Sequence, residues 1–163
     1  MSVAGKYKKA AKWVAPKKEN GKPVFPEGIV MGGMTADGET LYVARAEHNG
    51  DLLPGKLHPS HFVCYVAYNG KEHPKETYQV LVNPAKSNLD WVAASGGSVP
   101  AGALQGGRTA EGEALFIGRC KHGDDLVCGK VHPSHGVCYI SYAGKEHHYQ
   151  DYEVLVVKTV DLK

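Results

Sequence analysis

The chain has 163 residues, of which 42% are hydrophobic and 22% are charged, and this composition is typical of a folded globular protein. Its formal net charge of +2 is too small to indicate nucleic acid or an anionic membrane as the main partner. No run approaches the roughly 18 apolar residues that cross a bilayer, so we expect neither nucleic-acid binding nor membrane insertion.

Residues 1–12 form a basic N-terminal segment that is rich in lysine. A solvated chain end explains these lysines at least as well as a functional role does. The segment lacks the apolar stretch of a secretion signal. We therefore expect synthesis in the cytosol and a cytoplasmic location, with relocation or non-conventional release left open.

The rest of the chain is an internal duplication. Leu-Tyr-Val-Ala-Arg at 41–45 returns 74 residues later as Leu-Phe-Ile-Gly-Arg at 115–119, and Gly-Lys-Leu-His-Pro-Ser-His at 55–61 recurs at the same offset. Trp13 matches Trp91 at an offset of 78, so repeat one holds four extra residues in its first loop. We expect repeat one at 13–82, a linker at 83–90, repeat two at 91–157 and a C-terminal tail at 158–163.

Within each repeat, short β-branched and aromatic runs alternate with Gly, Pro, Asn and Asp, and no amphipathic helix is evident. This pattern predicts an all-β antiparallel fold, and the short linker favours pseudo-twofold packing of the two copies. Ala-Asp-Gly-Glu at 36–39 and Ala-Glu-Gly-Glu at 110–113 are typical of tight hairpin turns. The expected strands are 29–32, 41–47, 62–68, 77–82, 103–106, 115–121, 136–142 and 151–157.

Several separate motifs recur in the same order in both copies. They are Trp-Val, Gly-Gly before a turn, Leu-Tyr/Phe-Val/Ile-x-Arg, Gly-Lys-x-His-Pro-Ser-His, a Cys-Tyr strand, Gly-Lys-Glu-His and Tyr-x-Val-Leu-Val. The combined pattern resembles the DM9 repeat over nearly the whole chain. This resemblance implies a β protein of two intertwined units, assembled as a homodimer, that recognises mannose or mannose-containing glycans as a lectin of innate immunity.

The resemblance also implies where the sugar binds. In a mannose-binding DM9 lectin, an acidic residue after the Gly pair and the lysine of the Gly-Lys step hold the ligand. The lysine maps cleanly onto this sequence, whereas threonine stands at the position of the acid and an acid follows two residues later. Carboxylates accept from neighbouring hydroxyls and an ammonium donates up to three hydrogen bonds, which suits a hexose. We expect one set of sugar-binding groups per repeat: Thr35, Asp37, Asp51 and Lys56, and Thr109, Glu111, Asp125 and Lys130.

Two alternatives stay open at this point. Lys56 and Lys130 are equally well explained as solvated turn lysines. The neutral threonines favour a cytosolic, immune- or stress-responsive protein-interaction module that has lost sugar binding. Neither repeat contains a recognisable nucleophile–base motif or a phosphate-cradling Gly loop, so we expect a non-enzymatic protein without a cofactor.

Other recurring residues are interpreted as structural. Arg45 and Arg119 are in phase with apolar strand residues, and we expect Glu72 and Glu146 to pair with them. Both His-Pro-Ser-His segments favour rigid turns whose imidazoles bond backbone carbonyls. Their spacing argues against a local metal site, although a site shared by the repeats stays open. We expect core tryptophans and free, buried thiols at Trp13, Trp91, Cys64, Cys120, Cys128 and Cys138.

Overall fold

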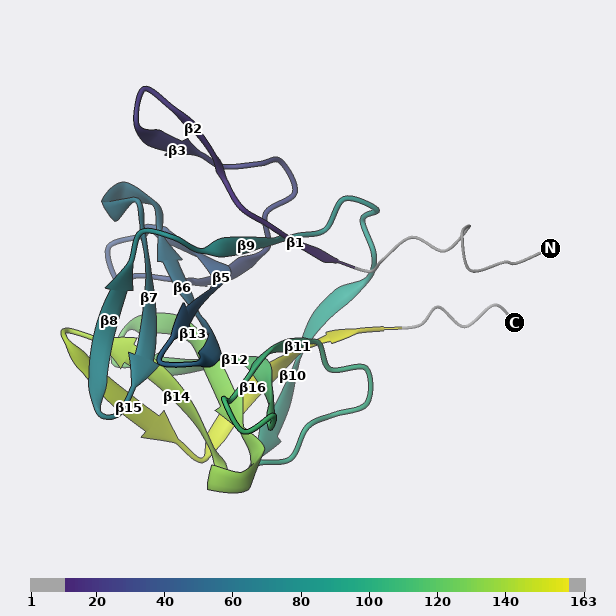
Figure 1. Ribbon diagram of the computed structural model, residues 1–163. Helices are drawn as coiled ribbons and strands as arrows, with labels where there is room; N and C mark the ends of the chain where they lie inside the picture. Colours follow the sequence, from purple (N-terminus) through teal and green to yellow (C-terminus); the bar gives the residue numbers. More distant parts are fainter. Residues whose placement is uncertain (1–10, 159–163) are drawn as a thin grey trace, which may run out of the picture.

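The computed structural model describes residues 11–158, and its regular elements are β-strands and two short 3-10 turns (Figure 1). No helix in this range is long and apolar enough to span a membrane. The all-β prediction is confirmed. The elements are β1 (Lys12–Val14), β2 (Lys17–Glu19), β3 (Lys22–Val24), β4 (Met31–Met34), β5 (Thr40–His48), β6 (Asp51–His58), η2 (Pro59–His61), β7 (Val63–Tyr68), β8 (Lys71–Lys75), β9 (Gln79–Val82), β10 (Leu89–Ser95), β11 (Gln105–Arg108), β12 (Ala114–His122), β13 (Asp125–His132), η3 (Pro133–His135), β14 (Val137–Tyr142), β15 (Lys145–Tyr149) and β16 (Asp151–Val157).

Every strand expected from the sequence is present, and its ends differ from the prediction by no more than two residues. The long strands β6 and β13 were not predicted, because each carries a glycine in its middle. A Cβ on Gly55 would lie 2.2 Å from the Tyr65 carbonyl oxygen, and a Cβ on Gly129 would lie 2.1 Å from that of Tyr139. These glycines therefore allow close approach of two strands within the sheet, which is a known role of glycine inside a strand.

The two repeats share one antiparallel sheet. Strand β4 pairs with β5 of its own repeat and with β13 of the other, and β11 pairs in the same way with β12 and β6. A third contact joins β8 to β15 at Lys71 and Lys145. Further pairings of β5 with β6 and of β12 with β13 close the sheet on itself. The predicted pseudo-twofold arrangement is confirmed, because the strand pairings of one copy have equivalents in the other.

The hydrophobic core is shared between the repeats. One cluster consists mainly of side chains of repeat one, a second belongs to repeat two, and a third lies between them. The third cluster joins Val43 and Leu81 to Ile117 and Leu155, all of them at most 1% exposed. Trp13 and Trp91 pack against it, as expected. Neither repeat therefore has a complete core without the other.

The predicted partners of the two arginines were wrong. Arg45 donates to the Gln79 side chain at 2.9 Å and to the Gly106 carbonyl at 3.2 Å, and its guanidinium lies 4.2 Å from the ring centroid of Trp13. Arg119 makes the corresponding contacts with Glu153 at 2.7 Å and with Trp91. A planar guanidinium stacks on an indole while its edge bonds a neighbouring strand, so no distant carboxylate is required.

The Gly pairs in β4 and β11 allow the repeats to pair. A Cβ on Gly33 would lie 2.0 Å from the Leu126 carbonyl oxygen, and one on Gly107 would lie equally close to that of Leu52. We predict that Gly33→Ala lowers the free energy of unfolding by about 3 kcal/mol, since the clash is with backbone. Urea unfolding checks this prediction.

Gly38→Ala is the matched control, because Gly38 has a φ of +95° but no heavy atom within 4 Å of an added Cβ. Gly38→Ala is expected to cost about 1 kcal/mol, because an alanine at positive φ is strained while its Cβ meets no neighbour. Equal losses in the two variants would contradict the idea that the Gly pair is required for close strand contact.

Candidate functional site

The turn between β4 and β5 is organised by the hydroxyl of Thr35. This oxygen accepts a hydrogen bond from the Glu39 amide at 2.9 Å and donates one to the Asp37 carboxylate. Thr109 accepts in the same way from the Glu113 amide at 3.0 Å and is 7% exposed. The two threonines are thus turn-capping residues, and the donor of Thr35 is used inside the turn. Thr35 in this way also holds the neighbouring Asp37 carboxylate in place.

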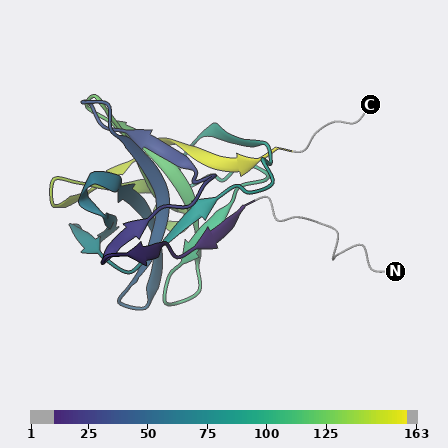
Figure 2. The same cartoon turned by 90° about the horizontal axis from the view of Figure 1, so that it is seen from above.

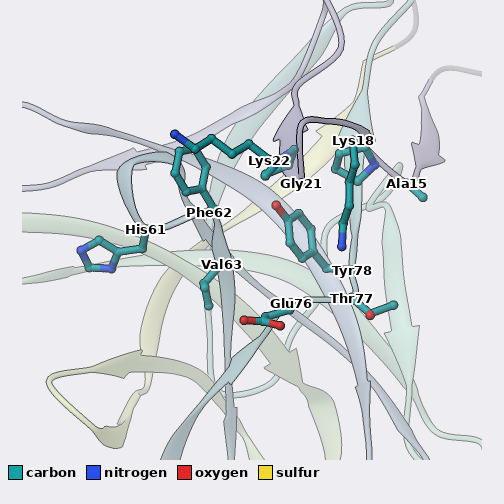
Figure 3. A pocket seen from close by; sticks show the side chains of 12 residues that line it. Ala15, Lys18, Gly21, Lys22, His61, Phe62, Val63, Glu76, Thr77 and Tyr78 are labelled. Carbon is teal, nitrogen blue, oxygen red and sulfur yellow. The ribbon is translucent and has the colours of Figure 1, made fainter.

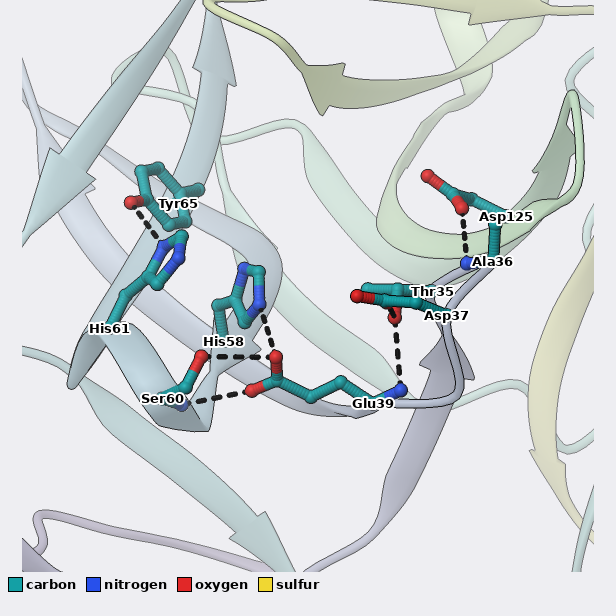
Figure 4. Close-up of polar contacts among 9 residues, drawn as sticks. All are labelled: Thr35, Ala36, Asp37, Glu39, His58, Ser60, His61, Tyr65 and Asp125. Carbon is teal, nitrogen blue, oxygen red and sulfur yellow. Dashed lines mark hydrogen bonds and ion pairs between the residues drawn. The ribbon is translucent and has the colours of Figure 1, made fainter.

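Each turn is also held by an aspartate from the other repeat. Asp125 accepts a hydrogen bond from the Ala36 amide (Figure 4). Asp51 accepts one from the Ala110 amide at 2.7 Å. The ribbon seen from above shows strands of both repeats side by side (Figure 2). The sequence grouped Asp51 with Thr35 and Asp125 with Thr109, and that grouping was wrong. Each aspartate reaches the turn of the other repeat, because β4 lies beside β13 and β11 beside β6.

The lysines of the Gly-Lys steps are buried, not solvated. Lys56 is 7% exposed, and its ammonium donates to the Ser141 carbonyl at 2.6 Å and lies 3.2 Å from the Glu72 carboxylate. Lys130 makes the equivalent contacts with the Ala67 carbonyl at 2.7 Å and with Glu146 at 3.4 Å. Burial lowers the pKa of Lys130, although Glu146 acts against this effect. The glutamates expected beside the arginines are therefore the partners of the lysines.

The turn, the aspartate and the lysine of one set line a cleft, which we call the inter-repeat cleft. It has a volume of about 340 Å3, within the range of small-ligand sites. Its polar lining comes from both repeats, and Leu41 and Val127 form part of its apolar wall. The polar residues are Thr35, Asp37, Lys56, His58, Asp125 and Tyr142.

Electrostatics in the inter-repeat cleft is dominated by its two carboxylates. A hydrogen bond with Asp125 raises the pKa of Tyr142, and the charge of Asp37 adds to the effect. The ammonium of Lys56 lies 5.4 Å from the ring centroid of Tyr142. Two contacts occupy this ammonium, which has three N–H donors, so one donor remains for a ligand. The cleft therefore offers charged acceptors, a charged donor and an aromatic ring.

The second set is built in the same way. Asp51 reaches the turn that carries Thr109 and Glu111, and the Lys130 ammonium lies 5.8 Å from the ring centroid of Tyr68. The duplicated fold therefore forms two equivalent sets of residues. In each set the aspartate that bonds the turn comes from the other repeat.

Glu39 joins the turn to the His-Pro-Ser-His segment. Its carboxylate bonds His58 Nε2 at 2.7 Å and accepts from the amide of Ser60 at 2.9 Å and from its hydroxyl at 3.0 Å (Figure 4). His61 Nδ1 lies 2.8 Å from the Tyr65 hydroxyl. The imidazoles of His58 and His61 stack with their ring centroids 3.8 Å apart. The predicted rigid turn is confirmed as η2. The expected carbonyl partners of these imidazoles were wrong, because side chains take that role.

The structure does not gather the histidines and cysteines into a metal site. Among residues 11–158, no group of three His, Cys, Asp or Glu side chains is arranged to hold a metal ion. The four cysteines are free and buried, as expected. Burial raises the pKa of the Cys128 thiol to about 12, so this thiol stays protonated and packs as a small apolar group.

Sequence reasoning missed Glu39 and Glu113 as residues that organise the site. Both are visible as acids four residues after each turn threonine, a spacing that allows the hydroxyl to cap the acid's amide. The sequence allows Tyr142 to line a sugar groove but favours core packing for most of the tyrosines, because the approach of Tyr142 to Asp125 depends on the path of β14 beside β13.

We predict that Lys56→Met lowers the free energy of unfolding by about 3–5 kcal/mol, because Glu72 then stays buried without its cation. Urea unfolding measures the change. Lys71→Met, at an exposed position one residue before Glu72, is the control and leaves the unfolding midpoint nearly unchanged. A loss that is equally small in both variants would show that the buried pair contributes nothing.

Stability also depends on pH through His132 and Glu113. Burial lowers the pKa of His132 below its ordinary value of 6.5, and the Ser134 hydroxyl lowers that of Glu113 below 4.5. The unfolded chain binds protons more readily in both cases, so the free energy of unfolding falls as the pH drops below 6.5 and again below 4.5.

The His132→Gln variant tests this pH dependence. Urea unfolding at stepped pH values is expected to show a shallower decline between pH 6.5 and 5 in the variant than in the native chain. An identical decline would remove His132 as the cause.

Comparison with known proteins identifies relatives over most of the chain. The family model described as "DM9 repeat" matches residues 4–74 and 35–149. Natterin-3 of Thalassophryne nattereri is 31% identical over 139 residues, which cover 85% of this chain and 35% of that protein. Natterin-4 of the same organism is 31% identical over 134 residues, covering 82% and 32%. The chain therefore spans about a third of the length of these relatives.

The fold itself is found in a solved structure. The nematode sperm cell motility protein MFP2B superimposes with a TM-score of 0.66 over 93% of this chain and 45% of that protein. The two sequences are 16% identical, so this likeness concerns the fold alone.

Proposed function

The chain belongs to the DM9 repeat family, and from this premise we propose that it is a carbohydrate-binding protein that takes a mannose-type residue in the inter-repeat cleft. A single observation carries the proposal. Asp37 of repeat one and Asp125 of repeat two line the same cleft of about 340 Å3 as the buried Lys56. Groups of opposite charge that converge in this way suit a ligand with many hydroxyls.

Each group has a definite role in this proposal. The carboxylates of Asp37 and Asp125 accept hydrogen bonds from neighbouring sugar hydroxyls, and the remaining N–H donor of Lys56 bonds a hydroxyl or the ring oxygen. Tyr142 contributes an aromatic edge and a hydroxyl. Thr35 keeps Asp37 in place without touching the sugar, so an acid two residues after the threonine takes the place of the family's usual acid.

Binding is expected without catalysis and without a cofactor. We also propose a homodimer in the cytosol with a role in innate immune recognition, in line with the family resemblance. Size-exclusion chromatography with light scattering tests the assembly, and a mass equal to one chain would contradict it.

The experiment that tests sugar binding is a mannose titration by calorimetry after a glycan-array screen. We predict that Asp37→Asn weakens binding at the first site about tenfold, because a charged acceptor becomes neutral while its bond to Thr35 is kept. Glu111→Gln removes the corresponding charge at the second set, and the double variant loses most binding. Asp151→Asn, at an exposed carboxylate outside the cleft lining, is the matched control.

Two outcomes decide against the proposal. Mannose binding of native strength in the double variant would place the sugar elsewhere. A native chain that binds nothing on a broad glycan array, but that captures a reproducible protein partner, would favour the protein-interaction module instead.

A further inference from the structure

The two repeats differ at one buried tyrosine. Tyr78 and Tyr152 occupy equivalent positions and are 6% and 5% exposed. The Tyr152 hydroxyl donates to the Ser98 carbonyl at 2.8 Å and accepts from the Gly97 amide at 2.9 Å. Among residues 11–158, the Tyr78 hydroxyl is the buried side-chain polar atom that has no partner. An unpaired buried hydroxyl is unfavourable unless something else bonds it.

The first loop of each repeat explains this difference. In repeat two a short loop after β10 folds over Tyr152 and supplies its partners. In repeat one the loop is four residues longer and forms the hairpin β2–β3, which extends away from the main sheet (Figure 1). A cavity of about 570 Å3 lies under this hairpin, and we call it the hairpin cleft. Its lining includes Lys18, Lys22, Phe62, Glu76 and Tyr78 (Figure 3).

Phe62 is a second feature that repeat two lacks. It is 41% exposed and has a φ of +58°, a left-handed conformation that is costly for a bulky residue. Gly136 occupies the equivalent position with a φ of +75°, where glycine is unstrained. The turn itself therefore calls for glycine, and the phenylalanine is retained at a cost in strain. Strain of this kind is typical of functional sites.

The charges of the hairpin cleft point to an anionic ligand. Its lining contains two lysines, Lys18 and Lys22, and one carboxylate, that of Glu76. The Lys22 ammonium lies 6.0 Å from the ring centroid of Phe62, so charge and aromatic surface are adjacent. Burial raises the pKa of Tyr78 to about 12, so its hydroxyl stays protonated and can donate. In Figure 3, His61 points away from the other labelled side chains.

We propose that the hairpin cleft is a second ligand site, present in repeat one alone, for a sugar ring that carries a carboxylate or sulfate group. The ring stacks its C–H face on Phe62, and the lysines bind the anionic group. Glu76 accepts from the sugar hydroxyls, and a small shift of the overlying hairpin on binding lets one hydroxyl reach the buried Tyr78 hydroxyl, which then gains its missing partner. This site is separate from the inter-repeat cleft and stands whether or not mannose binds there.

Calorimetric titration of the full chain with glucuronate and with galactose 6-sulfate tests the proposal, with glucose and galactose as neutral controls. The native chain is expected to bind at least one anionic sugar at least about tenfold more tightly than its neutral counterpart. Preference for glucuronate or for the sulfate identifies the source of the charge. Binding of neither, or equal binding of the neutral sugars, overturns the proposal.

Matched variants locate the site. Phe62→Gly, which copies repeat two, is expected to weaken anionic-sugar binding about tenfold without lowering the unfolding midpoint, because strain is relieved. Tyr78→Phe weakens it about fivefold and also leaves the fold intact. Tyr152→Phe lowers the unfolding midpoint but not the affinity. Asp37→Asn leaves this affinity unchanged. Native affinity in Phe62→Gly, or its loss in Asp37→Asn, overturns the assignment.

Discussion

The buried ammonium of Lys56 is held by both repeats at once. It lies against Glu72 of its own repeat and donates to the Ser141 carbonyl of the other, while Glu72 accepts from the Gly144 amide. Lys130 repeats these contacts with the roles of the repeats exchanged. Each ion pair lies within one repeat, but its hydrogen bonds to backbone are made only when the two repeats are interlocked. Removal of either partner would leave the other charge buried and unpaired, which is strongly destabilising. The lysine–glutamate pairs therefore favour the interlocked arrangement of the two repeats.

The same interlock creates the inter-repeat cleft. Because β4 lies beside β13, the turn that carries Asp37 contacts Asp125, although the two are far apart in the sequence. The turn threonine, the aspartate and the lysine each have a structural bond that fixes their position, and this order prepares the site before any ligand arrives. A preformed site avoids the entropic cost of ordering loops on binding. Stability and the proposed recognition therefore rest on one set of contacts.

Much of this architecture was predictable from the sequence, because the repeat, the alternating strands and the Asp-Gly and Glu-Gly turns are local signals. The strands β6 and β13 escaped prediction, since Gly55 and Gly129 indicate a break unless the neighbouring strand is known. The site residues were predicted by type, but their grouping was wrong. Sequence distance placed Asp51 with Thr35, whereas strand exchange between repeats places Asp125 there. Exchange of this kind leaves no local trace in the sequence.

The duplication also explains where the two halves are free to differ. Residues that join the two repeats contact the backbone of the other repeat, and Lys56, Glu72 and the Gly pair keep their identity in both repeats. The first loop of each repeat instead packs beside the tyrosine of its own repeat. Four extra residues there leave the buried Tyr78 hydroxyl without a partner, and Phe62 replaces glycine at a local cost alone. A duplicated fold can in this way keep a shared site unchanged while one copy acquires a surface of its own.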